Sequence, residues 1–180
     1  MSIYKTPQES HITISELMLP SHSNFSGKIH GGYILSLMDQ IAFACAAKYS
    51  GYYAVTASVD KVDFLQPIEV GELVTMKATV NFVGRSSMVV GVRVESENVR
   101  TGDKKHCNTS YFTMVARDEN GKSVAVPGLI LDSESTIRRF VRSAKRQEQG
   151  KARRAAFNPA TFNLDEHLDV LKDYNVKINL

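Results

Sequence analysis

Long apolar runs and clustered cysteines are both missing from this sequence of 180 residues. No stretch of about 18 apolar residues is free of charge, so we expect no membrane-spanning helix. The first residues lack the basic-then-apolar order of a signal peptide, so we expect no export. Cys45 and Cys107 lie in apolar segments, without the paired spacings of a metal site or a disulfide framework. We therefore predict two buried, reduced thiols and a cytoplasmic location.

The chain also has little net charge, but its basic residues are concentrated near the C-terminus. The formal charge is +3. Eight basic residues lie in one stretch in which Glu148 is the only acid; they are Arg138, Arg139, Arg142, Lys145, Arg146, Lys151, Arg153 and Arg154. Such a stretch fits an anionic partner, which could be nucleic acid, a phosphorylated cofactor or the acidic face of another subunit. It equally fits a solvated helix face.

One apolar segment stands out. Residues 31–49 are apolar almost all round, so a helix there must be enclosed on every side. Residues 73–83 alternate instead, with Val74, Met76, Ala78, Val80 and Phe82 on one face. Residues 88–94 and 107–115 repeat the alternation, and residues 84–87, 101–103 and 120–121 are typical of tight turns. These patterns predict an antiparallel meander that follows a central helix.

Two further extended segments would complete the sheet. Residues 54–65 are extended, with a change of phase near Lys61 that suggests a bulge or strong bend. Residues 11–19 form an early strand. We therefore predict an α+β domain over residues 1–130, with an antiparallel sheet of five to six strands wrapped around a long helix. Because one sheet covers only part of such a helix, a second copy of the chain would bury the rest.

The C-terminal part is predicted to be an extension. Over residues 131–180 the pattern changes to a basic helix at 133–149 and a short acidic, amphipathic helix at 164–171. We interpret this region as helical and not as a second domain, because the chain has the length of a single ordinary core.

Asp39 is the most unusual residue in the predicted central helix. It lies two turns inside the helix, with apolar residues as its helical neighbours. A buried carboxylate is costly unless it is paired, and its pKa rises towards the range of a general base. The alternative is an aspartate bonded to a backbone amide or an interface arginine, so placement alone favours function only slightly.

A polar, glycine-bearing loop over residues 23–32 leads into this helix. The N-terminal amides near Gly31 and Gly32 could hold a carbonyl oxygen as it becomes an oxyanion. Two glycines could equally serve only a sharp turn and a close contact. His30 adjoins these amides, although a lone histidine at a helix start more often caps or packs.

Four motifs in order resemble a known family. The pattern formed by Asn24, Gly27, Gly31-Gly32 and Met38-Asp39 is similar to that of acyl-CoA thioesterases related to cytosolic long-chain acyl-CoA hydrolases and YciA-type bacterial proteins. Residues 56–60, 64–68 and 84–88 are similar to later motifs of that family. The resemblance extends over about residues 23–115, and four ordered motifs are more specific than a glycine pair.

The resemblance implies a hotdog fold, a homodimer unit and commonly a trimer of dimers, and thus a homohexamer. It implies hydrolysis of acyl-CoA to fatty acid and coenzyme A, a reaction of fatty acid and lipid metabolism. Asp39 would be the catalytic acid, as base or nucleophile, and Asn24 of the opposing subunit would orient water or the thioester. No metal or redox cofactor is implied, because coenzyme A is part of the substrate.

The same resemblance favours further substrate contacts. The turn formed by Gly84, Arg85, Ser86 and Ser87 combines a cation with hydroxyls, which suits phosphate or pantetheine, although it also fits an ordinary hairpin. Thr56 and Ser58 would line the acyl or pantetheine channel. A weaker prediction assigns the nucleotide phosphates to three arginines, Arg138, Arg139 and Arg142.

Three other functions remain as alternatives. The chain could sense acyl-CoA without cleaving it, which binding without thiol release would reveal. It could bind nucleic acid through the basic extension, but the sequence lacks a recognition motif. A hotdog hydratase would need an Asp and His pair that the sequence does not place.

Known animal members join two hotdog units in one chain, whereas this chain holds one and would complete its site by oligomerising.

Overall fold

The computed structural model describes residues 3–156, 160, 162–164, 168–169, 174–177 and 179. The chain divides into two compact units, Met1–Ser143 and Ala144–Leu180. The first unit contains the sheet and the central helix.

The elements follow one another in a simple order. They are β1 (Tyr4–Lys5), α1 (Pro7–Ser10), β2 (Ile12–Leu17), the short 3-10 helix η1 (Pro20–His22), α2 (Gly31–Ser50), β3 (Tyr53–Val59), β4 (Glu72–Val83), β5 (Ser87–Asn98), β6 (Lys104–Arg117), β7 (Gly128–Leu129) and α3 (Glu134–Ala156). The predicted central helix is confirmed to within one residue at its C-terminal end. Each predicted strand of the meander is present, with slightly different bounds.

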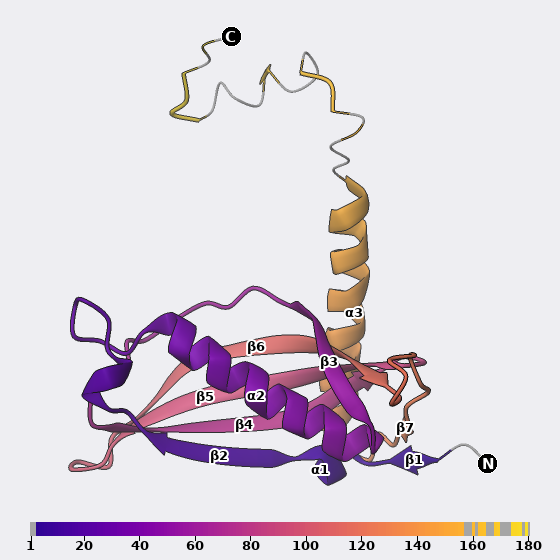
Figure 1. Cartoon of the computed structure of the whole chain (residues 1–180), viewed down its shortest axis with the longest axis horizontal. Coiled ribbons are helices and arrows are strands. Elements are labelled where there is room, and N and C mark those ends of the chain that lie inside the picture. The colour runs from indigo at the N-terminus through magenta and orange to yellow at the C-terminus, as the bar shows by residue number, and fades with distance from the viewer. Residues whose placement is uncertain are drawn as a thin grey trace. The chain divides into compact units, whose positions relative to one another are not determined.

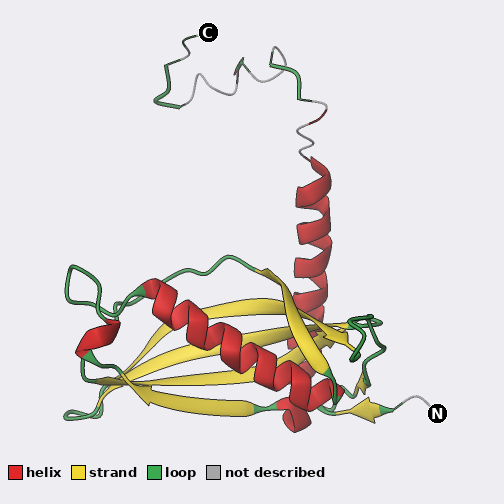
Figure 2. Cartoon of the chain, viewed as in Figure 1, coloured by secondary structure: helices red, strands yellow, loops and turns green. Residues whose placement is uncertain are grey.

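The main sheet has five strands in the order β2-β4-β5-β6-β3, and every neighbouring pair is antiparallel. Figure 1 shows this sheet curling around α2, and Figure 2 shows the helix lying across its concave face. A separate parallel pair joins β1 to β7. The structure confirms the predicted α+β class and a sheet curved around one long helix.

The core lies between α2 and the concave face of the sheet. The helix contributes Ile34, Leu37, Met38, Ile41, Cys45 and Tyr49, and the strands contribute Val74, Met76, Ala78, Val80, Val90, Val92, Val94, Phe112 and Met114. All are buried. Because strand side chains alternate between faces, these positions were predictable from the period of two. Burying each large apolar side chain stabilises the fold by about 1.5–3 kcal/mol.

Two details of the strand predictions are wrong. A bulge between Val80 and Phe82 shifts the phase of β4, so Phe82 pairs with Val89 on the outer face instead of pointing inward. There its ring contacts Phe140 of α3, with ring centroids 5.0 Å apart. The predicted irregularity near Lys61 is also misplaced, because β3 ends at Val59 and its bulge lies between Thr56 and Ser58.

The central helix is not enclosed on every side within one chain. Its inner face is buried, but Ser36, Gln40 and Phe43 are exposed. This uncovered face adjoins β3, which lies at the edge of the sheet. As predicted, one sheet covers only part of the helix. Burial of the remaining face by a second copy of the chain stays a prediction.

The C-terminal helix is longer than predicted. The basic helix expected at 133–149 is present as α3, which continues to Ala156. The short helix expected at 164–171 lies largely outside the described residues. Over the described part of the chain, no helix combines the length and the apolar character needed to cross a membrane.

Candidate active site

Asp39 and Thr56 form the contact that joins the central helix to the edge strand. The Thr56 hydroxyl donates to Asp39 Oδ1 at 2.6 Å. Among the described residues, nothing reaches the second carboxylate oxygen, Oδ2. The carboxylate is therefore held by one oxygen and presents the other, which is the arrangement that a positioned base or nucleophile requires.

Asp39 is less buried than the sequence suggested. Its neighbours Met38 and Leu37 point into the core, whereas Asp39 itself is half-exposed on the side of α2 that faces β3. The reason is the same as for the helix as a whole, because the sheet covers only the opposite face. The predicted enclosure of the helix included a second copy of the chain, so the burial of Asp39 in the assembly stays a prediction.

The start of α2 offers one free amide. His30 is the N-cap residue, and its Nδ1 accepts a hydrogen bond from the Gly32 amide at 2.9 Å. The Gly32 amide is thus occupied, whereas no described residue accepts from the amide of Gly31. Of the two amides predicted to hold the oxyanion, only that of Gly31 is therefore available. The capping role considered for His30 is confirmed.

Both glycines are needed for close contacts at this helix end. A Cβ at Gly31 would lie 3.1 Å from the Phe64 ring, and one at Gly32 would lie 2.8 Å from the His30 ring. The partial positive charge of the helix N-terminus would favour a negative oxygen there.

Asn24 lies in the loop that precedes α2, and this loop is tightly organised. Its Oδ1 accepts from the Ser26 amide at 2.9 Å, the Ser26 hydroxyl at 2.7 Å and the Lys28 amide at 3.2 Å. Lys28 forms an ion pair with Glu69 at 2.6 Å. Over the described residues of one chain, no hydrogen bond joins Asn24 to Asp39. Of the Asn24 side chain, only the amide nitrogen Nδ2 is left for another partner.

The Gly84–Ser87 turn lies at the opposite end of the sheet. It connects β4 to β5, and Gly84 donates its amide to Ser87 O at 2.8 Å. The Arg85 side chain is exposed and the carbonyl oxygens of Arg85 and Ser86 accept from Val126 and Ala116. β4 begins near the loop before α2 and ends at this turn, a length of roughly 40 Å at about 3.3 Å per residue. Within one chain, the turn and the start of α2 therefore lie at opposite ends of the sheet.

Of the remaining predicted residues, Thr56 bonds Asp39, and no hydrogen bond in the described structure joins Ser58 or the three arginines to it. Ser58 follows the bulge of β3 and is half-exposed. Arg138, Arg139 and Arg142 are exposed on the first part of α3. No hydrogen bond in the described structure connects these arginines to the Gly84–Ser87 turn.

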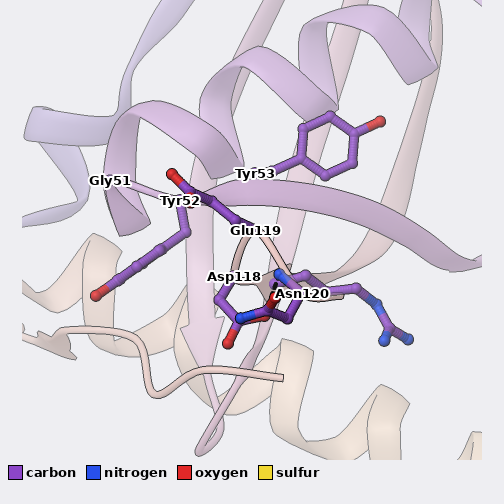
Figure 3. Close-up of a pocket in the computed structure, with 7 residues that line it drawn as sticks. Gly51, Tyr52, Tyr53, Asp118, Glu119 and Asn120 are labelled. Carbon is purple, nitrogen blue, oxygen red and sulfur yellow. Dashed lines mark hydrogen bonds between the residues drawn. The ribbon is translucent and has the colours of Figure 1, made fainter. Parts of the chain in front are cut away.

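An exposed aromatic pair beside Asp39 was missed from the sequence. Phe43 lies one helical turn after Asp39, and its ring centroid is 5.3 Å from that of Tyr53 at the start of β3. Tyr53 also lines a depression of about 490 Å³ at the end of α2, together with Tyr52 and the turn at 118–120. Figure 3 shows the two tyrosine rings pointing away from each other. The sequence could have indicated that Phe43 lies beside Asp39, because residues four apart lie on the same face of a helix.

Comparison with known proteins identifies the family. The family model described as Thioesterase superfamily matches residues 26–102. The Bacillus subtilis protein YkhA, named an uncharacterized acyl-CoA thioester hydrolase, is 36% identical over 82% of this chain and 86% of its own length. The chain belongs to the acyl-CoA thioester hydrolase family. The human cytosolic acyl coenzyme A thioester hydrolase is 32% identical over 83% of this thioesterase, which spans 40% of the human protein.

Solved structures agree with this assignment. A hexameric acyl-CoA thioesterase is 35% identical, with a TM-score of 0.81 over 87% of this thioesterase and 99% of that chain. The Staphylococcus aureus acyl-CoA hydrolase, solved with butyryl coenzyme A and coenzyme A, is 30% identical, with a TM-score of 0.79 over 94% of this chain and 99% of its own. The hotdog fold of this acyl-CoA thioesterase, predicted from its motifs, is thereby confirmed.

Proposed function

We propose that the protein hydrolyses acyl-CoA thioesters to free fatty acid and coenzyme A, with Asp39 as its catalytic residue. The observation that carries the proposal is the Thr56 hydrogen bond, which fixes one oxygen of Asp39 at 2.6 Å and leaves the other free. A half-exposed, oriented carboxylate can act on a carbonyl carbon whose oxygen is held by a helix N-terminal amide.

The Staphylococcus aureus hydrolase supports this choice of residues. It has been solved as three single alanine variants, of an asparagine, an aspartate and a threonine, which lie 15 and 17 residues apart. Asn24, Asp39 and Thr56 have the same residue types and the same spacings. The match supports a common set of three residues that acts together.

The proposed reaction begins with the thioester carbonyl at the start of α2. The Gly31 amide donates to the carbonyl oxygen as it gains negative charge. Because Asp39 of the same chain lies eight residues, or about 12 Å, along the helix from Gly31, the reacting Asp39 belongs to the partner chain. It either takes a proton from water, whose oxygen attacks the carbonyl carbon, or attacks that carbon itself to form an acyl–Asp39 anhydride that water cleaves later. The carbon–sulfur bond then breaks, and the coenzyme A thiolate takes up a proton. No metal or redox cofactor takes part in either route.

Single-turnover hydrolysis in ¹⁸O-labelled water separates the two routes. With enzyme in excess, a general base places solvent oxygen in the fatty acid during the first turnover. A nucleophilic Asp39 forms an anhydride, and water that attacks the Asp39 carbonyl carbon leaves an Asp39 oxygen in the first fatty acid and places ¹⁸O in Asp39. An unlabelled first product together with labelled Asp39 therefore identifies the nucleophilic route.

Two copies of the chain complete the proposed site. Among the described residues no strand pairs with the outer edge of β3, and Phe43, Tyr53 and Val59 are exposed beside it. We propose that two chains pair along β3 about a two-fold axis, and that three such dimers form a hexamer. Hexameric relatives support this assembly. The axis turns the ends of one sheet towards the opposite ends of the other, which brings Asn24 and the helix start of one chain to Asp39 and the Gly84–Ser87 turn of its partner.

The substrate contacts follow from this pairing. Arg85, Ser86 and Ser87 would bind the phosphates or pantetheine of coenzyme A, with a smaller contribution from Arg138, Arg139 and Arg142. Ser58 would line the channel beside Thr56. We place the enzyme in the cytoplasm, in fatty acid metabolism, because both thiols are buried and unpaired and the human relative is named cytosolic.

Thiol release from acyl-CoA of several chain lengths tests the proposal. The wild type should release coenzyme A, and Asp39→Asn should lower kcat by about 10²-fold or more while acyl-CoA binding changes little. Asn24→Ala should lower kcat less steeply. Acyl-CoA binding without thiol release by the wild type would support the sensing function instead.

A further inference from the structure

The loop before α2 carries an aromatic ring that no described residue of its own chain covers. Phe25 lies at the tip of this loop and is 114% exposed, which is more than in an extended reference peptide. A large apolar side chain so fully in water is unfavourable, and such groups mark contact surfaces. Figure 1 shows the loop projecting from the sheet at the start of α2.

The exposure of Phe25 does not come from a loosely held loop. The backbone on either side is closed by hydrogen bonds from Asn24 N to Lys28 O at 2.7 Å and from Gly27 N to Asn24 O at 3.0 Å. The Asn24 side chain accepts three more hydrogen bonds, and the Lys28–Glu69 ion pair ties the base of the loop to the start of β4. A pre-ordered aromatic group loses little entropy on binding, which is typical of an interface anchor.

The two-fold pairing along β3 determines what this ring meets. Because the paired edge strands are antiparallel, the two α2 helices also run in opposite directions. The start of one α2, with the loop in front of it, therefore lies beside the second half of the other α2. The exposed aromatic groups on that half and on the adjoining strand are Phe43, 37% exposed, and Tyr53, 64% exposed.

We infer that Phe25 of one chain packs on the Phe43–Tyr53 pair of a second copy and so positions the Asn24 loop over the partner's Asp39. Phe25 is then a positioning residue that acts in the neighbouring site, and the inference builds on the proposed function and its dimer. Aromatic rings pack well in offset or edge-on arrangements, and the tilted Phe43–Tyr53 pair leaves both rings accessible.

Substitution of Phe25 gives the first test. Phe25→Ala should weaken dimerisation in sedimentation velocity by about tenfold or more and lower kcat by about tenfold, with a smaller change in KM. Phe25→Leu should restore most of both. The matched control is Val99→Ala, which removes an exposed apolar side chain from the turn between β5 and β6 and should leave both unchanged.

Mixed oligomers show whether Phe25 acts within its own chain or in the next one. Phe25→Ala and Asp39→Asn chains, each with a different tag, are co-expressed and purified through both tags. If Phe25 acts on the partner, one site of each mixed dimer has an intact loop and an intact Asp39, and about half of the wild-type turnover per dimer returns. If Phe25 acts on its own chain, every site has a defect and no activity returns, which overturns the inference.

The remaining outcomes are also decisive. Unchanged oligomeric state and turnover in Phe25→Ala would overturn the inference, and so would a loss confined to binding of phosphatidylcholine–phosphatidylglycerol vesicles. A wild type that releases no thiol would refute the proposed function. The sedimentation of Phe25→Ala would still test the contact in that case, because it does not depend on turnover.

Discussion

At the scale of single residues, the Thr56 hydroxyl determines the orientation of the Asp39 carboxylate. Thr56→Val removes that donor but keeps the volume of the side chain, so kcat should fall by about tenfold, in line with about 1.5 kcal/mol for a hydrogen bond to a charged group. Thr56→Ser should keep most of the activity. Steady-state thiol release measures both, and equal loss in the two variants would point to packing instead of the hydrogen bond.

Glu72, at the start of β4, gives a prediction on pH. Burial alone raises the pKa of Glu72, but hydrogen bonds from Lys105, the Glu69 amide and Ser96 outweigh it and hold the pKa below its usual value. The charged form thus favours the folded state. Its stabilisation is complete above the unfolded pKa of about 4.3 and is lost as pH falls through the lower, folded pKa.

Glu72→Gln tests this prediction. Urea unfolding at pH 7 should show a free energy of unfolding lower by about 1–2 kcal/mol than in the wild type. The difference should shrink at acidic pH, below the folded pKa, because the wild-type side chain is then also neutral. A difference that stays constant with pH would indicate a packing effect.

At the scale of elements, α2 depends on its C-terminal cap. Gly51 follows the helix with a φ of 76°, and its amide donates to Ala47 O at 2.9 Å. Because residues with a Cβ are disfavoured at this φ, Gly51→Ala should lower the free energy of unfolding by about 1 kcal/mol. Thermal unfolding measures the change. The matched control is Gly150→Ala inside α3, where an alanine should be neutral or stabilising.

The elements were largely predictable from the sequence, and their errors have local causes. The inward positions of β4 to β6 follow a period of two, so Val74, Met76 and Val90 could be assigned directly. Phe82 could not, because a bulge one residue earlier reversed its face. A bulge leaves no clear pattern in a single sequence when the residues on both faces are apolar or small.

The candidate site was predictable only in part. The residue types of Asp39, Asn24 and the helix start were recognised by motif, but their exposure and partners depend on tertiary contacts. The hydrogen bond from the Gly32 amide to His30 could not be predicted, because it depends on the orientation of the His30 ring. The aromatic pair Phe43–Tyr53 depends on how β3 folds back beside α2, which no local pattern specifies.

At the scale of the whole molecule, the edge of β3 is the predicted point of assembly. Ala57 is exposed near the middle of this strand, close to the proposed two-fold axis. Ala57→Lys would place two like charges near each other across the axis, so the oligomer should dissociate and turnover should fall with it. Analytical ultracentrifugation measures the dissociation.

A lysine on the opposite edge strand provides the control. Ser15→Lys introduces the same charge at an exposed position of β2. It should leave the oligomer intact if β3 alone carries the dimer contact. Dissociation of Ser15→Lys to single chains, or an Ala57→Lys protein that keeps its dimers, would contradict dimerisation through β3.

The burial of the two cysteines has a chemical consequence, because the proposed reaction releases a thiol. Every turnover would release a free thiol into the site, and its oxidised form is a disulfide that exchanges readily with accessible protein thiolates. Cys45 and Cys107 are completely enclosed, and burial raises the pKa of the Cys45 thiol to about 12. Intact mass spectrometry of the folded protein after exposure to coenzyme A disulfide should show no adduct, and unfolded protein should show up to two. Burial of both cysteines would thus prevent the enzyme from forming mixed disulfides with the oxidised form of its own product.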